Sequence, residues 1–269
     1  MNFNRYRVKP GAKVDLDKRD PADRTGIPAA KQDRLRRLTE LAEQVDALQD
    51  LLYAEHRHKL LIVLQGMDTS GKDGTIRHVF SEVDPLGVRA VSFRAPVGEE
   101  LEHVYLWRIQ RQTPGKGEIV IFNRSHYEDV LVPRVHAAID PAECKRRYRQ
   151  INDFERMLAE NGTILLKFFL HISKGEQRAR LQERVDEPNK RWKFNPRDLK
   201  ERARWDDYMA AYEDAIEDTS SEWAPWYVVP SDSKSTRNLI VSSVLVETLE
   251  GLKMAYPQPA EDYSGIVVQ

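Results

Sequence analysis

Short apolar runs alternate with mixed polar and apolar stretches along this chain of 269 residues. Five apolar runs predict buried strands, at residues 59–65, 88–93, 118–122, 163–171 and 226–229. The stretches between them predict helices at 72–83, 99–112, 128–135, 141–160, 174–185, 198–217 and 235–256. Strands separated by helices are typical of an α/β fold with a mainly parallel sheet and helices on both faces. In such a sheet, ligands bind at the carboxyl ends of the strands.

The two ends of the chain differ from this regular middle part. Residues 1–28 are rich in Lys, Asp, Pro and Gly and lack periodicity, so they predict an arm that lies on the surface. A long helix is predicted at 29–56, with one apolar stripe made by Leu35, Leu38, Leu41, Val45, Leu48 and Leu52. The stripe is expected to pack on the core; a helix partner in an oligomer is the alternative. Because no repeat or long linker interrupts 29–256, a single domain is predicted there, followed by a tail at 257–269.

A glycine-containing loop follows the first predicted strand and reads Gly66-Met67-Asp68-Thr69-Ser70-Gly71-Lys72-Asp73-Gly74. A strand, such a loop and a helix start form the context of a phosphate-binding (Walker A) loop. The backbone N–H groups would point into one concavity, helped by the helix N-terminus. Lys72 would reach the outer phosphates, and the candidate loop contacts are Gly66, Thr69, Ser70, Gly71, Asp73 and Gly74. The alternative is an ordinary glycine-rich turn.

Two carboxylates distinguish this loop from the usual pattern. Asp73 stands where a Ser or Thr hydroxyl normally binds magnesium, and Asp68 adds a second carboxylate inside the loop. A loop that only holds nucleotide phosphates would gain nothing from two carboxylates. A loop that organises magnesium around several phosphoryl groups would gain from them.

A second group of polar residues follows the strand at 118–122. Asn123 holds the position where many phosphate-loop enzymes place a magnesium-binding Asp, and acids return at Glu128 and Asp129. Arg124 is the natural phosphate clamp, because a guanidinium binds phosphate through two parallel hydrogen bonds. A turn with an Arg salt bridge is the alternative.

A strongly basic stretch lies further along the chain, with Arg178, Arg180, Arg184, Lys190 and Lys193 as candidate phosphate contacts. Prolines and asparagines between its two predicted helices indicate a loop, so about 174–205 is predicted to form a helical lid. Closure of the lid would bring Arg groups onto a transferring phosphoryl group and exclude water. Interspersed acids indicate that part of this charge is a solvated face.

Other candidates carry less weight. Arg94 and Arg134 could meet a nucleotide phosphate. His126 is expected to be structural, because phosphoryl transfer depends on position and charge more than on a base. The tryptophans of the second half are expected to pack rather than to stack on a base, namely Trp192, Trp205, Trp223 and Trp226.

The composition narrows the classes of function. The formal net charge is −1, so an anion site must be a local concentration of Lys and Arg, and no nucleic-acid partner is expected. Cys144 is the only cysteine, which excludes an intramolecular disulfide and a cysteine metal cluster. The first residues lack the apolar stretch of a signal peptide, and no apolar run approaches the roughly 20 residues of a membrane span. A cytoplasmic protein without a membrane partner is therefore expected.

Together these residues resemble the polyphosphate kinases of family 2. The similarity rests on the loop 66–74, on Phe122-Asn123-Arg124-Ser125-His126-Tyr127-Glu128-Asp129-Val130, on Trp192-Lys193-Phe194, on 224–230 and on the opening 6–11. The resemblance implies phosphoryl exchange between inorganic polyphosphate and adenine or guanine nucleotides, dependent on Mg²⁺ or Mn²⁺. It also implies a thymidylate-kinase-like P-loop kinase fold and a homo-oligomer, either a dimer or a tetramer.

The resemblance assigns roles to individual residues. The family's catalytic positions fall on Asp68, Lys72, Arg124 and Arg178, and magnesium ligands are expected at Asp68, Asn123 and Glu128. Many members carry Asp where this chain has Asn123. Asn there resembles the class III subgroup, which accepts both AMP and ADP.

Two other classes of function stay open from the sequence. An ATP-dependent nucleoside monophosphate kinase would want a hydroxyl after Lys72, where Asp73 stands. A nucleotide-dependent switch or a nucleic-acid-binding module, neither of them an enzyme, would show exposed aromatics on its sheet or a basic overall charge.

Overall fold

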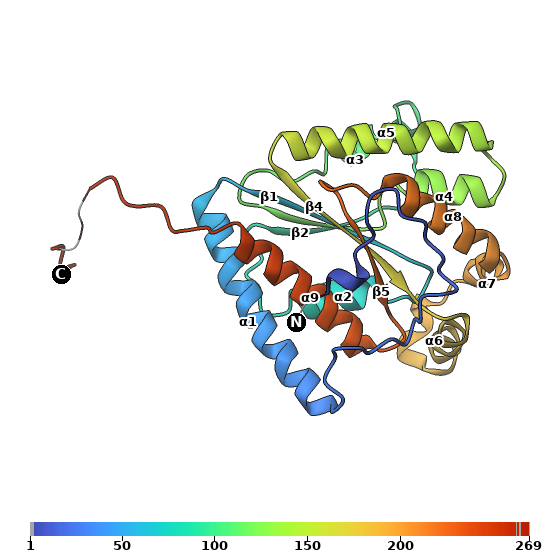
Figure 1. Ribbon diagram of the computed structural model, residues 1–269, viewed down its shortest axis with the longest axis horizontal. Helices are drawn as coiled ribbons and strands as arrows, with labels where there is room; N and C mark the ends of the chain where they lie inside the picture. The colour runs from blue at the N-terminus through green and yellow to red at the C-terminus, as the bar shows by residue number, and fades with distance from the viewer. Residues whose placement is uncertain (1–2, 262, 264, 269) are drawn as a thin grey trace.

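A five-stranded sheet forms the centre of the computed structural model, which describes residues 3–261, 263 and 265–268 (Figure 1). The strands are β1 (Lys59–Gln65), β2 (Val88–Ser92), β3 (Ile119–Asn123), β4 (Thr163–His171) and β5 (Trp226–Pro230). Their order is β2-β3-β1-β4-β5, and every neighbouring pair is parallel. All five carboxyl ends therefore share one edge of the sheet, with the end of β1 between those of β3 and β4. This confirms the predicted α/β class.

Helices cover both faces of the sheet. One face carries α1 (Lys31–Glu55), α2 (Lys72–Val79) and α9 (Lys234–Gly251), and the other carries α4 (Glu128–Val135), α5 (Pro141–Glu160) and α8 (Trp205–Thr219). Alternate residues of β1 serve the two sides: Leu60 and Ile62 join the first core, whereas Leu61 and Val63 join the second. Burial on both faces explains why the strands read as continuous apolar runs.

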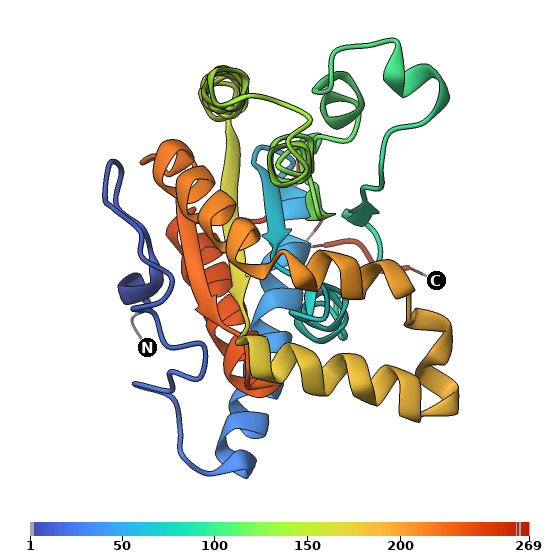
Figure 2. The same ribbon diagram turned by 90° about the vertical axis from the view of Figure 1, so that its right-hand side faces the viewer.

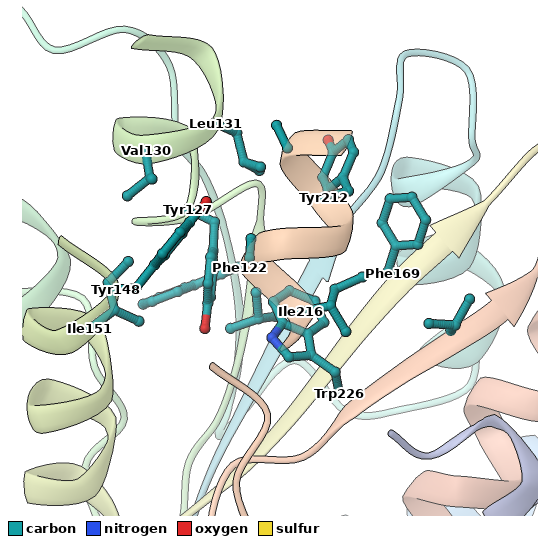
Figure 3. Packing of buried hydrophobic residues seen from close by; sticks show 14 of the residues in the cluster. Phe122, Tyr127, Val130, Leu131, Tyr148, Ile151, Phe169, Tyr212, Ile216 and Trp226 are labelled. Atoms are coloured by element: carbon teal, nitrogen blue, oxygen red, sulfur yellow. The ribbon is translucent and has the colours of Figure 1, made fainter. Parts of the chain in front are cut away.

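The aromatic part of the second core supports the strand ends. Phe122, Phe169 and Trp226 project from β3, β4 and β5 toward the helices of this face (Figure 3). Tyr127 meets the Trp226 ring edge-on, with the ring centroids 4.9 Å apart. This packing holds the chain just beyond β3 in a fixed position.

Shorter elements complete the chain. They are the 3₁₀ turns η1 (Asn4–Tyr6), η2 (Gly98–Leu101) and η3 (Pro188–Lys193), and the helices α3 (Trp107–Gln110), α6 (Lys174–Asp186) and α7 (Pro196–Ala203). Figure 2 shows α6 running away from the sheet, and η3 and α7 leading back to α8. In the part of the chain that the structure describes, no helix has the length and apolarity needed to cross a membrane.

Four predicted helices were wrong in extent. The helix expected at 99–112 is replaced by η2 and α3, because Leu101 and Val104 are exposed and offer no buried face. The helix expected at 198–217 is two helices broken at Arg204, because only α8 packs on the core. The last helix ends at Gly251 instead of 256. The remaining predicted bounds agree to within two residues, except that α2 ends at Val79 instead of 83.

The arm at 1–28 does more than lie on the surface, although residues 1–2 lie outside the described residues. Phe3, Val8 and Leu16 are almost fully buried in the two cores. The Val8 N–H donates to Trp226 O at 2.8 Å, beside an antiparallel bridge from Arg7 to β5. The arm therefore covers a sheet edge that would otherwise be open.

The first helix of the main domain and the tail after it agree with the sequence-based prediction only in part. The α1 stripe packs against α9 as expected, except that Leu35 is half exposed. Beyond α9 the chain leads away from the body (Figure 1). The predicted tail includes 262, 264 and 269, which lie outside the described residues.

Candidate active site

The glycine loop curls at the carboxyl end of β1. Gly66, Thr69 and Gly71 have positive φ, of 145°, 65° and 108°. A Cβ on Gly66 would lie 2.8 Å from Leu170 O, so this position requires glycine. The hydroxyls of Thr69 and Ser70 are buried without a hydrogen-bond partner. Buried polar atoms normally have partners, so these two hydroxyls are exceptions inside the loop.

Lys72 opens α2 and lies folded back over the loop. Its Nζ donates to Gly66 O at 2.7 Å and to Met67 O at 3.3 Å. Burial lowers the pKa of Lys72 to about 8, and the nearby Arg124 contributes to this shift. Within the described residues its hydrogen-bond partners are these two carbonyl groups, so a phosphate nearby would stabilise the ammonium charge.

Arg124 joins the ends of β1 and β3. It has φ of 62°, and its guanidinium donates to Asp68 Oδ1 at 2.6 Å and to Glu128 Oε2 at 3.2 Å. The carboxylate of Glu128 raises the pKa of Arg124 despite burial, so the guanidinium is a permanent cation. A second contact links the same strand ends, because Asn123 Nδ2 donates to Asp73 Oδ1 at 2.6 Å.

The acidic side chains here fit a magnesium ion that is completed by substrate. Asp68 and Glu128 face each other across Arg124, and Asp73 lies beside Asn123. Within the described residues, no three acidic, His or Cys side chains come together as a ready metal site. Mg²⁺ usually takes one or two carboxylates together with substrate phosphates, so such a cluster is not required.

A cavity of about 810 Å³ opens above the loop. It brings together most of the residues predicted to bind phosphate: Asp68, Thr69, Gly71, Lys72, Asp73, Gly74, Arg94, Asn123, Arg124, Arg180, Arg184, Lys190 and Lys193. Arg197 and Lys234 also line it. Sequence reasoning missed these two, although their basic character was visible.

The basic residues of α6 and η3 differ in how easily they could leave their present partners to bind a phosphate. Arg184 contacts Asp198, and Lys190 contacts Glu183 and Glu187. These partially exposed ion pairs are weak and can be exchanged for a phosphate.

Arg180 is different, because it is almost fully buried. It donates to Thr69 O at 2.9 Å and to Ser231 O at 2.8 Å. Arg180 thus binds α6 to the back of the loop, which is a supporting position.

Five predicted residues do not line this cavity. Gly66 borders the second cavity described below. The carbonyl of Ser70 points away from the cavity and accepts hydrogen bonds from Arg180 and Arg237. Arg178 is exposed on α6 and lines neither cavity.

Glu128, predicted as a metal ligand, borders the second cavity as well. Arg134 points elsewhere, to Asp214 at 2.5 Å and to Tyr148 Oη at 3.3 Å. The charge of Arg134 is therefore already balanced by a carboxylate, and no nucleotide phosphate is needed to pair with it.

A second cavity, of about 420 Å³, adjoins the first. Apolar and aromatic side chains form much of its lining, among them Met67, Phe93, Tyr208 and Tyr212. Both cavities are bordered by Asp68, Phe93, Arg94, Arg124 and Arg197. A basic chamber and a largely apolar chamber thus meet at the Asp68–Arg124 pair.

Arg237 of α9 is a functional candidate that the sequence analysis missed. It is 2% exposed, and its Nη1 donates to Ser70 O at 3.1 Å. Burial lowers the pKa of this guanidinium, and the neighbouring Arg180 lowers it further. A Cβ on Gly71 would lie 1.8 Å from Arg237 Nη1, so the loop and this guanidinium fit closely. The sequence signal that could have identified Arg237 is a single Arg within an otherwise largely apolar helix.

His126 belongs to a buried network, as expected for a structural residue. Its Nε2 lies 3.2 Å from Glu155 Oε1, and Lys167 Nζ lies 2.5 Å from Glu155 Oε2. The Tyr127 hydroxyl also donates to Glu155 Oε1, at 2.9 Å. Paired and hydrogen-bonded, these charges fix the segment that carries Arg124.

Comparisons with known proteins agree with this geometry. The profile of the family "Polyphosphate kinase 2" matches residues 29–257. An "AMP/ADP-polyphosphate phosphotransferase" of Meiothermus ruber is 55% identical over 99% of this chain and 100% of its own length. An "ADP-polyphosphate phosphotransferase" of Rhodopseudomonas palustris is 47% identical over 96% of this chain and 93% of its own length.

Solved structures give the same result. The crystal structure of polyphosphate kinase 2 from Arthrobacter aurescens TC1 superposes with a TM-score of 0.94 and 43% identity. The match covers 98% of this chain and 96% of that one. The fold is therefore the predicted P-loop kinase fold, and the chain is a phosphate-transferring enzyme that belongs to the polyphosphate kinase 2 family.

Proposed function

We propose that this enzyme transfers phosphoryl groups from inorganic polyphosphate to AMP and to ADP, and that the reactions are reversible. One observation carries the proposal: a basic cavity and a largely apolar cavity meet at Asp68 and Arg124. The similarity to a relative named for both AMP and ADP supports the two acceptors.

The basic cavity suits polyphosphate. A chain of linked phosphates carries charge along its whole length and needs a row of cations rather than one clamp. Arg184, Lys190, Lys193 and Lys234 offer such a row beyond the loop. The net charge of −1 shows that this positive potential is local.

The second cavity suits a nucleoside. Nucleobases bind well against aromatic and apolar side chains, with a few polar groups for orientation. Phe93, Tyr208 and Tyr212 supply the apolar surface, and Arg124 lies where the terminal phosphate of the nucleotide would meet the donor. Guanine and adenine nucleotides both fit this description.

The chemistry follows from position and charge. The loop N–H groups, Lys72 and Arg124 stabilise the charge on the transferring phosphoryl group, which is the main demand of this reaction. Arg124 exchanges its bonds to Asp68 and Glu128 for bonds to phosphate. Those two carboxylates, with Asn123, would then hold Mg²⁺ or Mn²⁺, which neutralises phosphate charge when bound.

The segment 174–205 is proposed to act as a lid. It joins the body through the buried Arg180, whereas Arg178 is exposed and Arg184 would exchange its contact with Asp198 for one with substrate. Closure would exclude water from the phosphoryl group. We further propose that the arm at 1–28, the domain at 29–256 and the tail at 257–269 act as distinct parts.

The assembly is proposed to be a homodimer or homotetramer in the cytoplasm, where its nucleotide substrates occur. Leu86, Val97, Leu101 and Val104 are each more than 60% exposed, which supports an interface there. Light scattering coupled to size exclusion tests the assembly.

A donor–acceptor matrix tests the activity. Polyphosphate or ATP is offered with AMP, ADP, GMP or GDP, and products are separated by chromatography. ADP from AMP and ATP from ADP with polyphosphate alone is the expected result. Turnover only with ATP as donor would identify a nucleoside monophosphate kinase. Absence of turnover in every pair would favour a nucleotide-binding switch.

A further inference from the structure

The segment just beyond β2 forms part of the wall of both cavities. Phe93, Arg94 and Ala95 line the basic cavity and the largely apolar one. The Phe93 N–H donates to Asn123 O at 3.1 Å, which places this segment beside the end of β3. From Arg94 onward the segment belongs to no helix or strand until η2 begins at Gly98. The position of Arg94 therefore depends on side chains that come from other elements.

Arg108 of α3 holds this segment. It is 6% exposed, and its Nη1 donates to Arg94 O at 2.6 Å. Its Cζ lies 5.6 Å from the centre of the Phe93 ring, within the range of a cation–π contact. The same Nη1 lies 3.5 Å from Glu100 Oε2, which accepts from the Val97 N–H. One buried guanidinium thus contacts three residues of the stretch 93–100.

Asp129 fixes Arg108 in turn. Nη2 of Arg108 donates to both carboxylate oxygens of Asp129, at 3.2 and 3.0 Å. The Asp129 side chain is 11% exposed, so water and salt screen this ion pair little. Asp129 belongs to the first turn of α4, and its carbonyl accepts from Arg147 of α5. Because α4 begins shortly after Arg124, Arg108 links the wall at Arg94 to the strand end at Arg124.

The guanidinium of Arg94 is left without a partner of its own. Arg94 is exposed, and within the described residues no carboxylate pairs with its side chain and no carbonyl accepts from it. It borders both cavities, as Asp68 and Arg124 do, where the donor and acceptor phosphates would meet. A cation stabilises a phosphoryl group most when it is already in place. The main chain of Arg94 is therefore fixed, while its charge is free for a ligand.

We infer that Arg108 is a positioning residue for the nucleotide. It holds the backbone of Arg94 so that the Arg94 guanidinium meets the acceptor's phosphate at the junction of the two cavities. The inference deepens the proposed function and rests on it. Among the described residues, Arg108 forms no hydrogen bond or ion pair with the row proposed for polyphosphate, namely Arg184, Lys190, Lys193 and Lys234. Its loss should therefore weaken nucleotide binding more than polyphosphate binding.

Steady-state kinetics of Arg108→Gln test this role. The matched control is Arg111→Gln, which makes the same charge change at an exposed residue directly after α3 that lines neither cavity. Arg108→Gln should raise KM for AMP and for ADP about 10-fold, the size of a lost charged hydrogen bond. KM for polyphosphate should stay within about twofold of wild type in both variants. Circular dichroism checks that the variants fold, and Arg108→Lys, which keeps the charge beside Asp129, carries the same comparison if Arg108→Gln does not fold.

A double variant separates positioning from a general structural role. Arg94→Ala alone should raise nucleotide KM by a similar factor. In that background Arg108→Gln should change nucleotide KM by no more than about twofold, because the residue through which it acts is already gone. Effects that multiply in full would overturn the route through Arg94.

Titration calorimetry with ADP, without polyphosphate, needs no turnover. Arg108→Gln should bind ADP about 10-fold more weakly than wild type and Arg111→Gln. Equal ADP affinity of Arg108→Gln and Arg111→Gln, with both variants folded, would overturn the inference. Failure of the wild type to use polyphosphate would refute the proposed function alone, and the ADP titration would still decide the role of Arg108.

Discussion

The shape of the phosphate-binding loop depends on close contact between Gly71 and Arg237. Gly71 has φ of +108°, and a Cβ there would lie 1.8 Å from Arg237 Nη1 and 2.6 Å from Arg237 Cζ. Nonbonded atoms stay about 3.5–4 Å apart, so Gly71→Ala would force the guanidinium from its place. Arg237 would then lose its bonds to Ser70 O and to Asn238 Oδ1.

Two contributions set the expected magnitude for Gly71→Ala. An alanine in this backbone conformation costs about 1–3 kcal/mol. Displacing a buried charged donor from its acceptors costs about 1.5–3 kcal/mol more. The free energy of unfolding should therefore fall by about 2.5–6 kcal/mol. The displaced loop should also lower kcat/KM about 100-fold, as expected for a misplacement of about 1 Å.

Urea unfolding and steady-state kinetics measure both effects. Gly162→Ala is the matched control, because Gly162 has φ of +82° and nothing within 4 Å of its Cβ position. It carries the backbone contribution alone, about 1–3 kcal/mol, and should keep full activity. In an Arg237→Ala background, Gly71→Ala should lose its extra destabilisation, since the two residues are in contact. If Gly71→Ala is no worse than Gly162→Ala in stability and turnover, Arg237 does not support the loop.

Further outcomes are expected at four residues. Lys72→Ala and Arg124→Ala should each lower kcat about 100- to 1,000-fold or more with the fold intact, because phosphoryl charge loses its partner; near-normal turnover at saturating magnesium would refute the phosphate site. Log kcat/KM should fall above about pH 8 as Lys72 loses its proton, and Lys72→Arg should lack this limb. Because the unfolded chain holds that proton more tightly, Lys72 should make stability rise between about pH 8 and its ordinary pKa of 10.5. Arg178→Gln should lower kcat more than it raises nucleotide KM, because an exposed lid residue meets phosphate only on closure; a pure KM effect would place it in ground-state binding. Asn123→Asp should lower AMP use relative to ADP use, because a carboxylate would replace the amide that donates to Asp73 and would repel a phosphate nearby; an unchanged AMP-to-ADP ratio would remove Asn123 from acceptor choice.

Local patterns in the sequence were enough to predict the strands of the sheet and the phosphate loop. The limits of β1 and β4 agree with the predicted runs residue for residue, because strands buried on both faces are mostly apolar. The loop 66–74 and the segment 122–130 were identified because their chemistry is encoded in consecutive residues. Lys72 and Arg124 therefore needed no tertiary information.

Contacts between segments that are distant in the sequence could not be predicted from such local patterns. Arg180 was predicted as a phosphate contact and lines the basic cavity, but the sequence did not reveal that it also donates to Thr69 O and Ser231 O and so supports the loop. Arg237 lies 166 residues beyond Gly71 in the sequence (237 − 71) but fills the space that a side chain there would need. The arm read as surface because it lacks periodicity, although a segment that is held by single buried side chains needs none. Sequence periodicity reports only how one element faces the core, whereas the support of a site depends on which elements meet, and that is decided by packing in three dimensions.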